Sequence, residues 1–235
     1  MDGLLIDSER VYTISFSEVL IKLGVKQGLT WDLKARLQGL PGVEACQVTI
    51  DFHHLQDKIT AEELFKLTSE RQLELWPQVN LLPGVSKLIN YLHDHKIPIC
   101  VCTGSDKAKY EMKTQNSHSV FKLFDGNIIT ADNDTIKGKG KPLPFIWWLG
   151  LDTINEKVKA LGEEEIKPEE CLIFEDAIPG FISGKRAGGY VIWVPDSHAL
   201  ELLDDKQVSE LVGEENQHGI ILKSLEEFDP SEFGL

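Results

Sequence analysis

Residues 8–80 carry apolar positions at helical spacing and contain no convincing strand pattern. Phe16 and Leu20 lie on one face of a first predicted helix, and Gly24 supplies its stop. A Thr-x-x-Glu capping box at Thr60 predicts another helix start. The pattern therefore predicts a unit of four to five helices with no sheet of its own.

The pattern changes after Leu82, where short apolar runs begin to alternate with helical stripes. Ile97–Cys102 is a nearly unbroken apolar run, which is typical of a strand buried on both faces. Further strands are predicted near 127–130, 171–174 and 190–194, with a last edge strand at 220–222. The helices between them are predicted near 85–92, 106–114, 142–160 and 178–187. Strands that alternate with helices favour a parallel sheet covered by helices on both sides.

The predicted fold class is therefore α/β, with a Rossmann-like parallel sheet core and an inserted α-helical domain. We expect the core domain to comprise residues 1–9 and 81–235 and the helical domain to comprise residues 10–80. Hinges between the two are expected near residues 7–10 and 78–84.

The charge of the chain narrows the classes of partner. The sequence has 24 Lys and Arg residues against 38 Asp and Glu residues, a formal net charge of −14. Nucleic acids and anionic membranes need a basic face, so neither is expected as the main partner. No apolar run reaches the length of a membrane span, and Asp2 directly after Met1 argues against a secretory signal.

The four cysteines, Cys46, Cys100, Cys102 and Cys171, show neither zinc spacing nor a disulfide framework. We expect reduced thiols in a cytosolic protein. The seven histidines show no paired ligand spacing either, so zinc is not expected.

Four short segments combine residues that suit a phosphate and a metal. They are Asp2-Gly3, Thr103-Gly104-Ser105, Lys141-Pro142 and Glu175-Asp176, and the last three follow predicted elements of the sheet. Ligands of such sheets bind beyond the carboxyl ends of the strands.

Each of the four segments also has an ordinary structural interpretation. Thr103 or Ser105 could cap a helix, and Lys141 lies in a lysine-rich stretch that is normally a solvated loop. Adjacent acids at the end of an apolar strand, such as Glu175 and Asp176, are costly without a cation, so a hard metal is their natural partner. Asp132 and Asp134 are an outside alternative for the metal, and a solvated acid pair is the favoured interpretation of them.

Together, the four segments resemble the motif set of the haloacid dehalogenase (HAD) superfamily, whose members are mostly phosphatases. That family opens with Asp-x-Asp-Gly at the end of an apolar strand, and its first Asp is the nucleophile. Met1 occupies the x position, so the resemblance places the nucleophile one residue before Met1. It implies that Asp2 is the general acid/base and that its backbone carbonyl ligates Mg²⁺.

The resemblance assigns roles to the other segments as well. The Thr103 hydroxyl and the N–H groups of Gly104 and Ser105 would bind phosphoryl oxygens at a helix N-terminus. Lys141, in a Lys-Pro-x-Pro sequence, would neutralise nucleophile and phosphate, although Phe145 stands where the family commonly has an acid. Asp176 would bind Mg²⁺ directly, with Glu175 beside it or outside its ligand shell.

The helical domain would be the cap of a HAD enzyme, which closes over the site and selects the substrate. Gln38 and Gly39 begin the segment Gln-Gly-Leu-Pro-Gly, which resembles the cap loop that reaches the substrate. Related sugar-phosphate mutases carry basic residues there, whereas none lies between Gln38 and Glu44, although Arg36 is close. This favours a simple phosphatase over a phosphomutase.

The whole chain is similar to the eukaryotic pseudouridine-5′-phosphatase branch of the family. That implies a cytoplasmic, Mg²⁺-dependent monomer acting on a small phosphorylated metabolite through a phosphoaspartate, with pseudouridine 5′-phosphate as the leading substrate. Two alternatives stay open: a sugar- or polyol-phosphate phosphatase or phosphomutase of the same fold, and a catalytically inactive, truncated HAD-like protein. Fold alone does not select among them.

Overall fold

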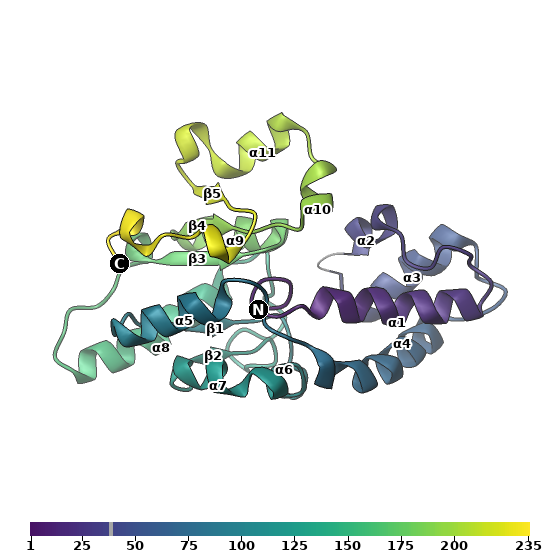
Figure 1. The fold of residues 1–235 in the computed structure, drawn as a ribbon, viewed down its shortest axis with the longest axis horizontal. Helices are drawn as coiled ribbons and strands as arrows, with labels where there is room; N and C mark the ends of the chain where they lie inside the picture. Colours follow the sequence, from purple (N-terminus) through teal and green to yellow (C-terminus); the bar gives the residue numbers. More distant parts are fainter. Residues whose placement is uncertain (38–39) are drawn as a thin grey trace. The chain divides into compact units, whose positions relative to one another are not determined.

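The computed structural model describes residues 1–37 and 40–235, which form two compact units (Figure 1). The core unit comprises Met1–Ile6 and Asn80–Leu235, and the inserted unit comprises Asp7–Val79. Each unit has hydrophobic clusters of its own.

The inserted unit is helical, as the spacing of its apolar residues predicts. Its helices are α1 (Ser8–Lys22), α2 (Trp31–Leu37), α3 (Gly42–His53), α4 (Ala61–Leu75) and the short 3₁₀ helix η1 (Trp76–Gln78). The capping box at the start of α4 is confirmed, because the Thr60 hydroxyl accepts from the Glu63 N–H and the Glu63 carboxylate accepts from the Thr60 N–H.

Packing of α1, α3 and α4 holds the inserted unit together. Leu20, Cys46 and Leu64 are fully buried in one cluster. On its surface, the Arg71 guanidinium donates to both carboxylate oxygens of Glu18, at 2.6 and 3.1 Å, and so ties α4 to α1. This bidentate contact holds the pKa of Glu18 below its ordinary value.

The core unit is α/β, and all its strand pairings are parallel. Its strands are β1 (Val101–Cys102), β2 (Ile128–Ile129), β3 (Leu172–Glu175), β4 (Tyr190–Trp193) and β5 (Gly219–Ile221). Among the described residues they form two sheets, β1-β2 and β3-β4-β5. The strands expected near 127–130, 171–174, 190–194 and 220–222 are thus confirmed, the last as an outer strand.

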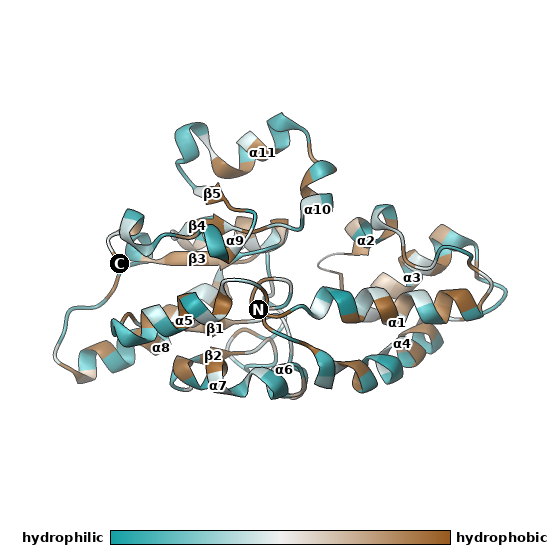
Figure 2. Ribbon diagram, viewed as in Figure 1, coloured by the Kyte–Doolittle hydropathy of each residue, from teal (hydrophilic) through white to brown (hydrophobic). Residues whose placement is uncertain are grey.

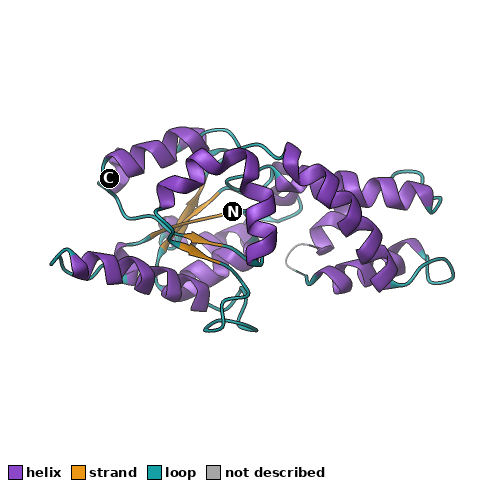
Figure 3. Ribbon diagram, turned by 90° about the horizontal axis from the view of Figure 1, so that it is seen from below, coloured by secondary structure: helices purple, strands orange, loops and turns teal. Residues whose placement is uncertain are grey.

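Helices lie on both sides of the strands of the core unit (Figure 3). They are α5 (Val85–Asp94), α6 (Lys107–Thr114), α7 (His118–Phe121), α8 (Phe145–Ala160), α9 (Ile178–Ala187), α10 (Ser197–Glu201) and α11 (Asp205–Val212). α8 contacts β1, β2 and α9, and α9 contacts β3 and β4. The strands are mainly apolar and many helices are striped in apolar and polar residues (Figure 2), as expected of helices that bury one face.

Two details differ from the sequence prediction. The strand expected over Ile97–Cys102 is assigned only at its last two residues, because β1 pairs with β2 only at Val101 and Cys102. Three short helices were not predicted: α7 before β2, and α10 and α11 between β4 and β5. α11 begins with its own capping box, formed by Asp204 and Gln207, and this pattern is visible in the sequence.

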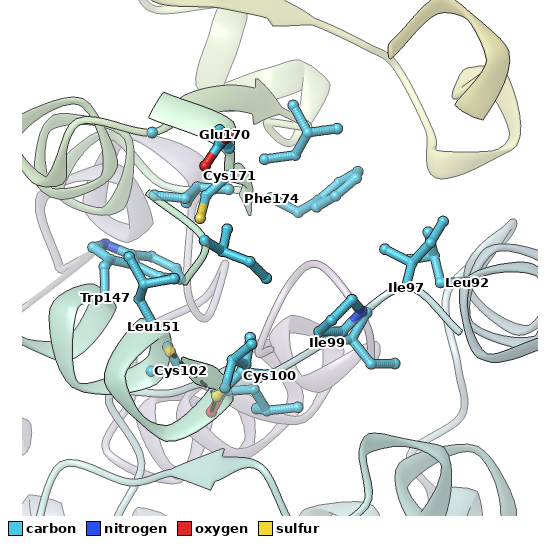
Figure 4. Close-up of a pocket in the computed structure, with 18 of the residues that line it drawn as sticks. Leu92, Ile97, Ile99, Cys100, Cys102, Trp147, Leu151, Glu170, Cys171 and Phe174 are labelled. Atoms are coloured by element: carbon cyan, nitrogen blue, oxygen red, sulfur yellow. Dashed lines mark hydrogen bonds between the residues drawn. The ribbon is translucent and has the colours of Figure 1, made fainter. Parts of the chain in front are cut away.

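A cavity of about 530 Å³ lies within the core unit, between the two sheets. β1 and β3 are each an outer strand of their sheet, and both line this cavity. Figure 4 shows Ile99 and Cys100 on one wall and Cys171 and Phe174 on another. Two strand edges therefore border one apolar space.

We expect Gly84→Ala to destabilise the core unit far more than Gly162→Ala. Both glycines have positive φ, +82° and +79°, so both substitutions carry the strain of a left-handed backbone. A Cβ at Gly84 also overlaps the backbone of Leu225 and Glu226, whereas Gly162 faces open space. Urea unfolding should show an additional loss of about 1–3 kcal/mol for Gly84→Ala. Equal losses would contradict this packing.

Candidate active site

Asp2 lies in a tight loop that the first residues of the chain form around one carbonyl group. The Met1 carbonyl accepts from the N–H groups of Leu5 and Ile6, at 2.8 and 3.2 Å, and Gly3 adopts a φ of +63°. The turn brings the Asp2 side chain to two partners. Its Oδ1 accepts from Lys113 Nζ at 2.6 Å and its Oδ2 accepts from Ser105 Oγ at 3.1 Å.

The segment Thr103–Ser105 follows β1 directly and leads into α6. Thr103 is 2 % exposed, and its Oγ1 accepts from the N–H of Ser105 at 3.1 Å. Asp106 caps α6, because its carboxylate accepts from the Lys109 N–H. Neither Thr103 nor Ser105 is the cap, so the ordinary interpretation of these two hydroxyls is wrong.

The same contacts change the part expected of Ser105. Its N–H, expected to face a phosphoryl oxygen, donates within the loop to Thr103 instead. Its hydroxyl donates to Asp2. Gly104 is exposed, in keeping with a loop that presents backbone to a ligand.

Lys141 is joined to Glu175 by an ion pair. The Glu175 side chain is 5 % exposed, and the Lys141 ammonium also lies 3.5 Å from the Cys102 carbonyl oxygen and 4.5 Å from the centre of the Trp147 ring. Burial alone would lower the pKa of Lys141, but the Glu175 carboxylate outweighs it and raises this pKa above its ordinary value. Lys141 is therefore held as a cation at the carboxyl end of β1, and is not part of a solvated loop.

Gly180 makes room for this pair. It lies in the first turn of α9, and a Cβ there would overlap the carboxylate of Glu175. The start of a helix favours a nearby negative charge, so α9 also stabilises Glu175. Asp176, the next residue, accepts from Trp193 Nε1 through its backbone oxygen at 2.9 Å.

The structure thus brings together four of the sequence segments around the end of β1. Asp2 reaches Ser105, and Lys141 reaches both Glu175 and the Cys102 carbonyl that precedes Thr103. Sequence reasoning missed Lys113, which is 1 % exposed and contacts Asp2. Little in the sequence singled out Lys113, because a lysine in a helix is normally expected at the surface and this one lies on the buried face of α6.

Other candidates lie elsewhere or cannot be placed. Gln38 and Gly39 fall outside the described residues. Asp132 and Asp134 are exposed, and the Asp132 carboxylate accepts from the Lys107 N–H at 3.1 Å, as expected of loop acids.

The four cysteines are free thiols. No helix in the described part of the chain has the length and apolarity needed to cross a membrane.

The site offers oxygen donors suited to a hard cation, but among the described residues these do not form a complete ligand set. Over residues 1–37 and 40–235, no three His, Cys, Asp or Glu side chains gather as a ready metal cluster. Mg²⁺ is usually held by one or two carboxylates together with waters and substrate phosphate, and the Asp176 carboxylate and the Asp2 backbone carbonyl are oxygen donors of this kind. The Asp2 carboxylate itself is engaged by Lys113 and Ser105. Glu175 is engaged by Lys141, which places it outside the direct ligands.

Residues 1–188 match the family of haloacid dehalogenase-like hydrolases. The chain belongs to this family. The match includes all four site segments and the whole inserted unit, and the resemblance seen in the sequence is confirmed.

Two relatives match this HAD chain over its full length. It is 44% identical to a probable pseudouridine-5′-phosphatase of Saccharomyces cerevisiae over 100% of this chain and 94% of that protein. It is 31% identical to (DL)-glycerol-3-phosphatase 2 of Arabidopsis thaliana over 100% of this chain and 89% of that protein.

The fold is also similar to a crystal structure of a HAD family hydrolase from Deinococcus radiodurans with bound phosphate and sodium. The TM-score is 0.73 at 18% identity, covering 100% of this chain and 93% of that chain. This likeness confirms the predicted α/β fold class.

We expect Lys141→Met to destabilise the core unit by about 3 kcal/mol, because it leaves the Glu175 carboxylate buried without its cation. Urea unfolding measures the loss, and Lys141→Met combined with Glu175→Gln should recover part of it. Lys206→Met is the matched control, since Lys206 pairs with Glu210 at 3.8 Å on the exposed surface of α11 and should change little. A loss no larger than that of the control would contradict the buried pair.

Proposed function

We propose that this HAD hydrolase is a Mg²⁺-dependent phosphatase that hydrolyses a small phosphate monoester, with pseudouridine 5′-phosphate as the leading substrate. The observation that carries the proposal is the half-buried cation Lys141 at the end of β1, beside the Thr103–Ser105 loop and within the same unit as Asp2. A fixed cation, hydroxyl groups and a carboxylate at strand ends suit a phosphoryl group and its leaving oxygen.

The roles of the chain's own residues follow from their chemistry. Thr103 donates its hydroxyl to a phosphoryl oxygen, and Lys141 neutralises the negative charge that builds up during transfer. Asp2 protonates the leaving oxygen and then takes a proton from the attacking water. Glu175 holds Lys141 in place through the buried ion pair.

We assign the nucleophile to a carboxylate two residues before Asp2, in the Asp-x-Asp order of the family. Its strand would occupy the apolar cavity between β1 and β3. Two observations support this placement: both strands are outer strands of their sheets, and both line the same cavity of about 530 Å³. A strand inserted there would satisfy backbone groups of both edges.

The Asp176 carboxylate and the Asp2 backbone carbonyl are the groups that would hold Mg²⁺. When bound, the ion supplies charge neutralisation at the phosphoryl oxygens. Glu175 does not compete for this task, because its carboxylate is paired with Lys141.

The substrate assignment rests on the most similar relative reported above, and the inserted unit is proposed as the cap that selects it. The glycerol-3-phosphatase relative supports the second candidate, a polyol-phosphate phosphatase. Within the described residues next to the proposed cap loop, Arg36 lies 5.2 Å from the centre of the Phe52 ring. The loop segment from Gln38 to Glu44 carries no basic residue, which favours a phosphatase over a phosphomutase.

The experiment that tests the function compares two proteins on several substrates. One is residues 1–235, and the other carries an added apolar strand of roughly ten residues ending in Phe-Asp directly before Met1. We expect Mg²⁺-dependent phosphate release from pseudouridine 5′-phosphate, ahead of glycerol 3-phosphate, by the extended protein only. We also expect the extended protein to be more stable, because a filled cavity removes unpaired backbone groups, each worth about 1–3 kcal/mol. Robust turnover by residues 1–235 would show that the nucleophile is misplaced.

Asp176→Ala should abolish Mg²⁺-dependent turnover of the extended protein, because a cation that demands near-octahedral oxygen geometry loses a carboxylate ligand. The measurement is phosphate release over a series of Mg²⁺ concentrations. Asp134→Ala is the control, since Asp134 is exposed and outside the site. Unchanged activity of Asp176→Ala at limiting Mg²⁺ would contradict the assignment.

A further inference from the structure

Lys113 is the most deeply buried charged side chain near the proposed site, at 1 % exposure. It lies on α6, where the neighbouring lysines Lys107 and Lys109 are exposed. Moving an ammonium group out of water is costly unless a negative partner and hydrogen bonds compensate it. The partners of Lys113 therefore explain why a lysine is tolerated there.

Lys113, Asp2 and Ser105 contact one another pairwise. Its Nζ donates to Asp2 Oδ1 at 2.6 Å and to Ser105 Oγ at 3.1 Å. An ammonium group can only donate, so the Ser105 oxygen accepts from Lys113 and its own hydrogen goes to Asp2 Oδ2. Each oxygen of the Asp2 carboxylate thus has a donor, and the carboxylate cannot rotate without breaking one of these bonds.

We infer that Lys113 is a positioning residue, which orients Asp2 and compensates its charge so that the Thr103–Ser105 loop can bind a phosphoryl dianion. This inference rests on the proposed phosphate site. Asp2 contacts Ser105, so an uncompensated Asp2 carboxylate would repel an anion bound at this loop. Lys113 offsets that repulsion by placing a buried positive charge 2.6 Å from the Asp2 carboxylate.

A double-mutant cycle separates this role from simple support of the fold. Binding of inorganic phosphate to residues 1–235 is measured by calorimetry for the unmodified protein, Lys113→Met, Asp2→Asn and the double variant. We expect Lys113→Met to weaken binding at least about tenfold, because the Asp2 charge becomes uncompensated. The double variant should return to within about threefold of the unmodified protein, because the charge that Lys113 compensates is gone. Lys107→Met, on the exposed face of α6, should bind as the unmodified protein does.

Two results would overturn the inference. One is an unchanged affinity in Lys113→Met, and the other is an equal loss in Lys113→Met and the double variant. If Lys113→Met does not fold but the double variant does, the result supports the inference, because removing the Asp2 charge then removes the need for Lys113. If neither variant folds, Lys113 serves only the fold and the inference is wrong.

Failure of the proposed function gives a different result. In that case the unmodified protein binds no phosphate. The urea unfolding midpoints of the unmodified protein, the two single variants and the double variant still measure the coupling between Lys113 and Asp2. Midpoints that add independently would then reject the link between Lys113 and Asp2, and non-additive midpoints would retain the positioning of Asp2 alone.

Discussion

The ion pair between Lys141 and Glu175 is the interaction on which the arrangement of the candidate site depends. Glu175 ends β3 with its side chain 5 % exposed, and a carboxylate so far from water needs a cation and further polar support. Lys141 supplies the cation from the loop before α8, and the first turn of α9 approaches through Gly180. The need to neutralise Glu175 thus brings β3, the loop before α8 and the start of α9 together.

A second charged cluster includes Ser105 of the Thr103–Ser105 loop. There the contacts among Asp2, Ser105 and Lys113 hold the first residues of the chain against α6. The end of β1 connects the two clusters, because the Cys102 carbonyl contacts Lys141 and the next residue is Thr103. The site is therefore built from paired charges, which lets a protein of net charge −14 hold two cations close to one strand end.

The apolar cavity in the core unit has a different physical character. Its walls include two outer strands and apolar side chains from α5 and α8. Buried strand edges carry backbone donors and acceptors that need partners, so a cavity bordered by two of them favours an extended segment over a small molecule. This is why it supports the proposed position of the nucleophile strand and is not itself the candidate active site.

Local chemistry let the sequence by itself determine most of the fold. Helical spacing marked the inserted unit, the Thr60 capping box marked the start of α4, and apolar runs before Thr103 and Glu175 marked β1 and β3. The four site segments were recognised together through their resemblance to the HAD motif set, because each segment alone also has an ordinary structural interpretation.

Only the tertiary structure decided which of these polar groups meet. Lys113 and Asp2 are separated by 111 positions, and Lys141 and Glu175 by 34, so no local pattern links them. The short length of β1 could not be predicted either, because an apolar run indicates burial but does not specify which strand it pairs with or over how many residues. These ion pairs form only when tertiary packing brings distant residues together, and no local sequence pattern specifies that geometry.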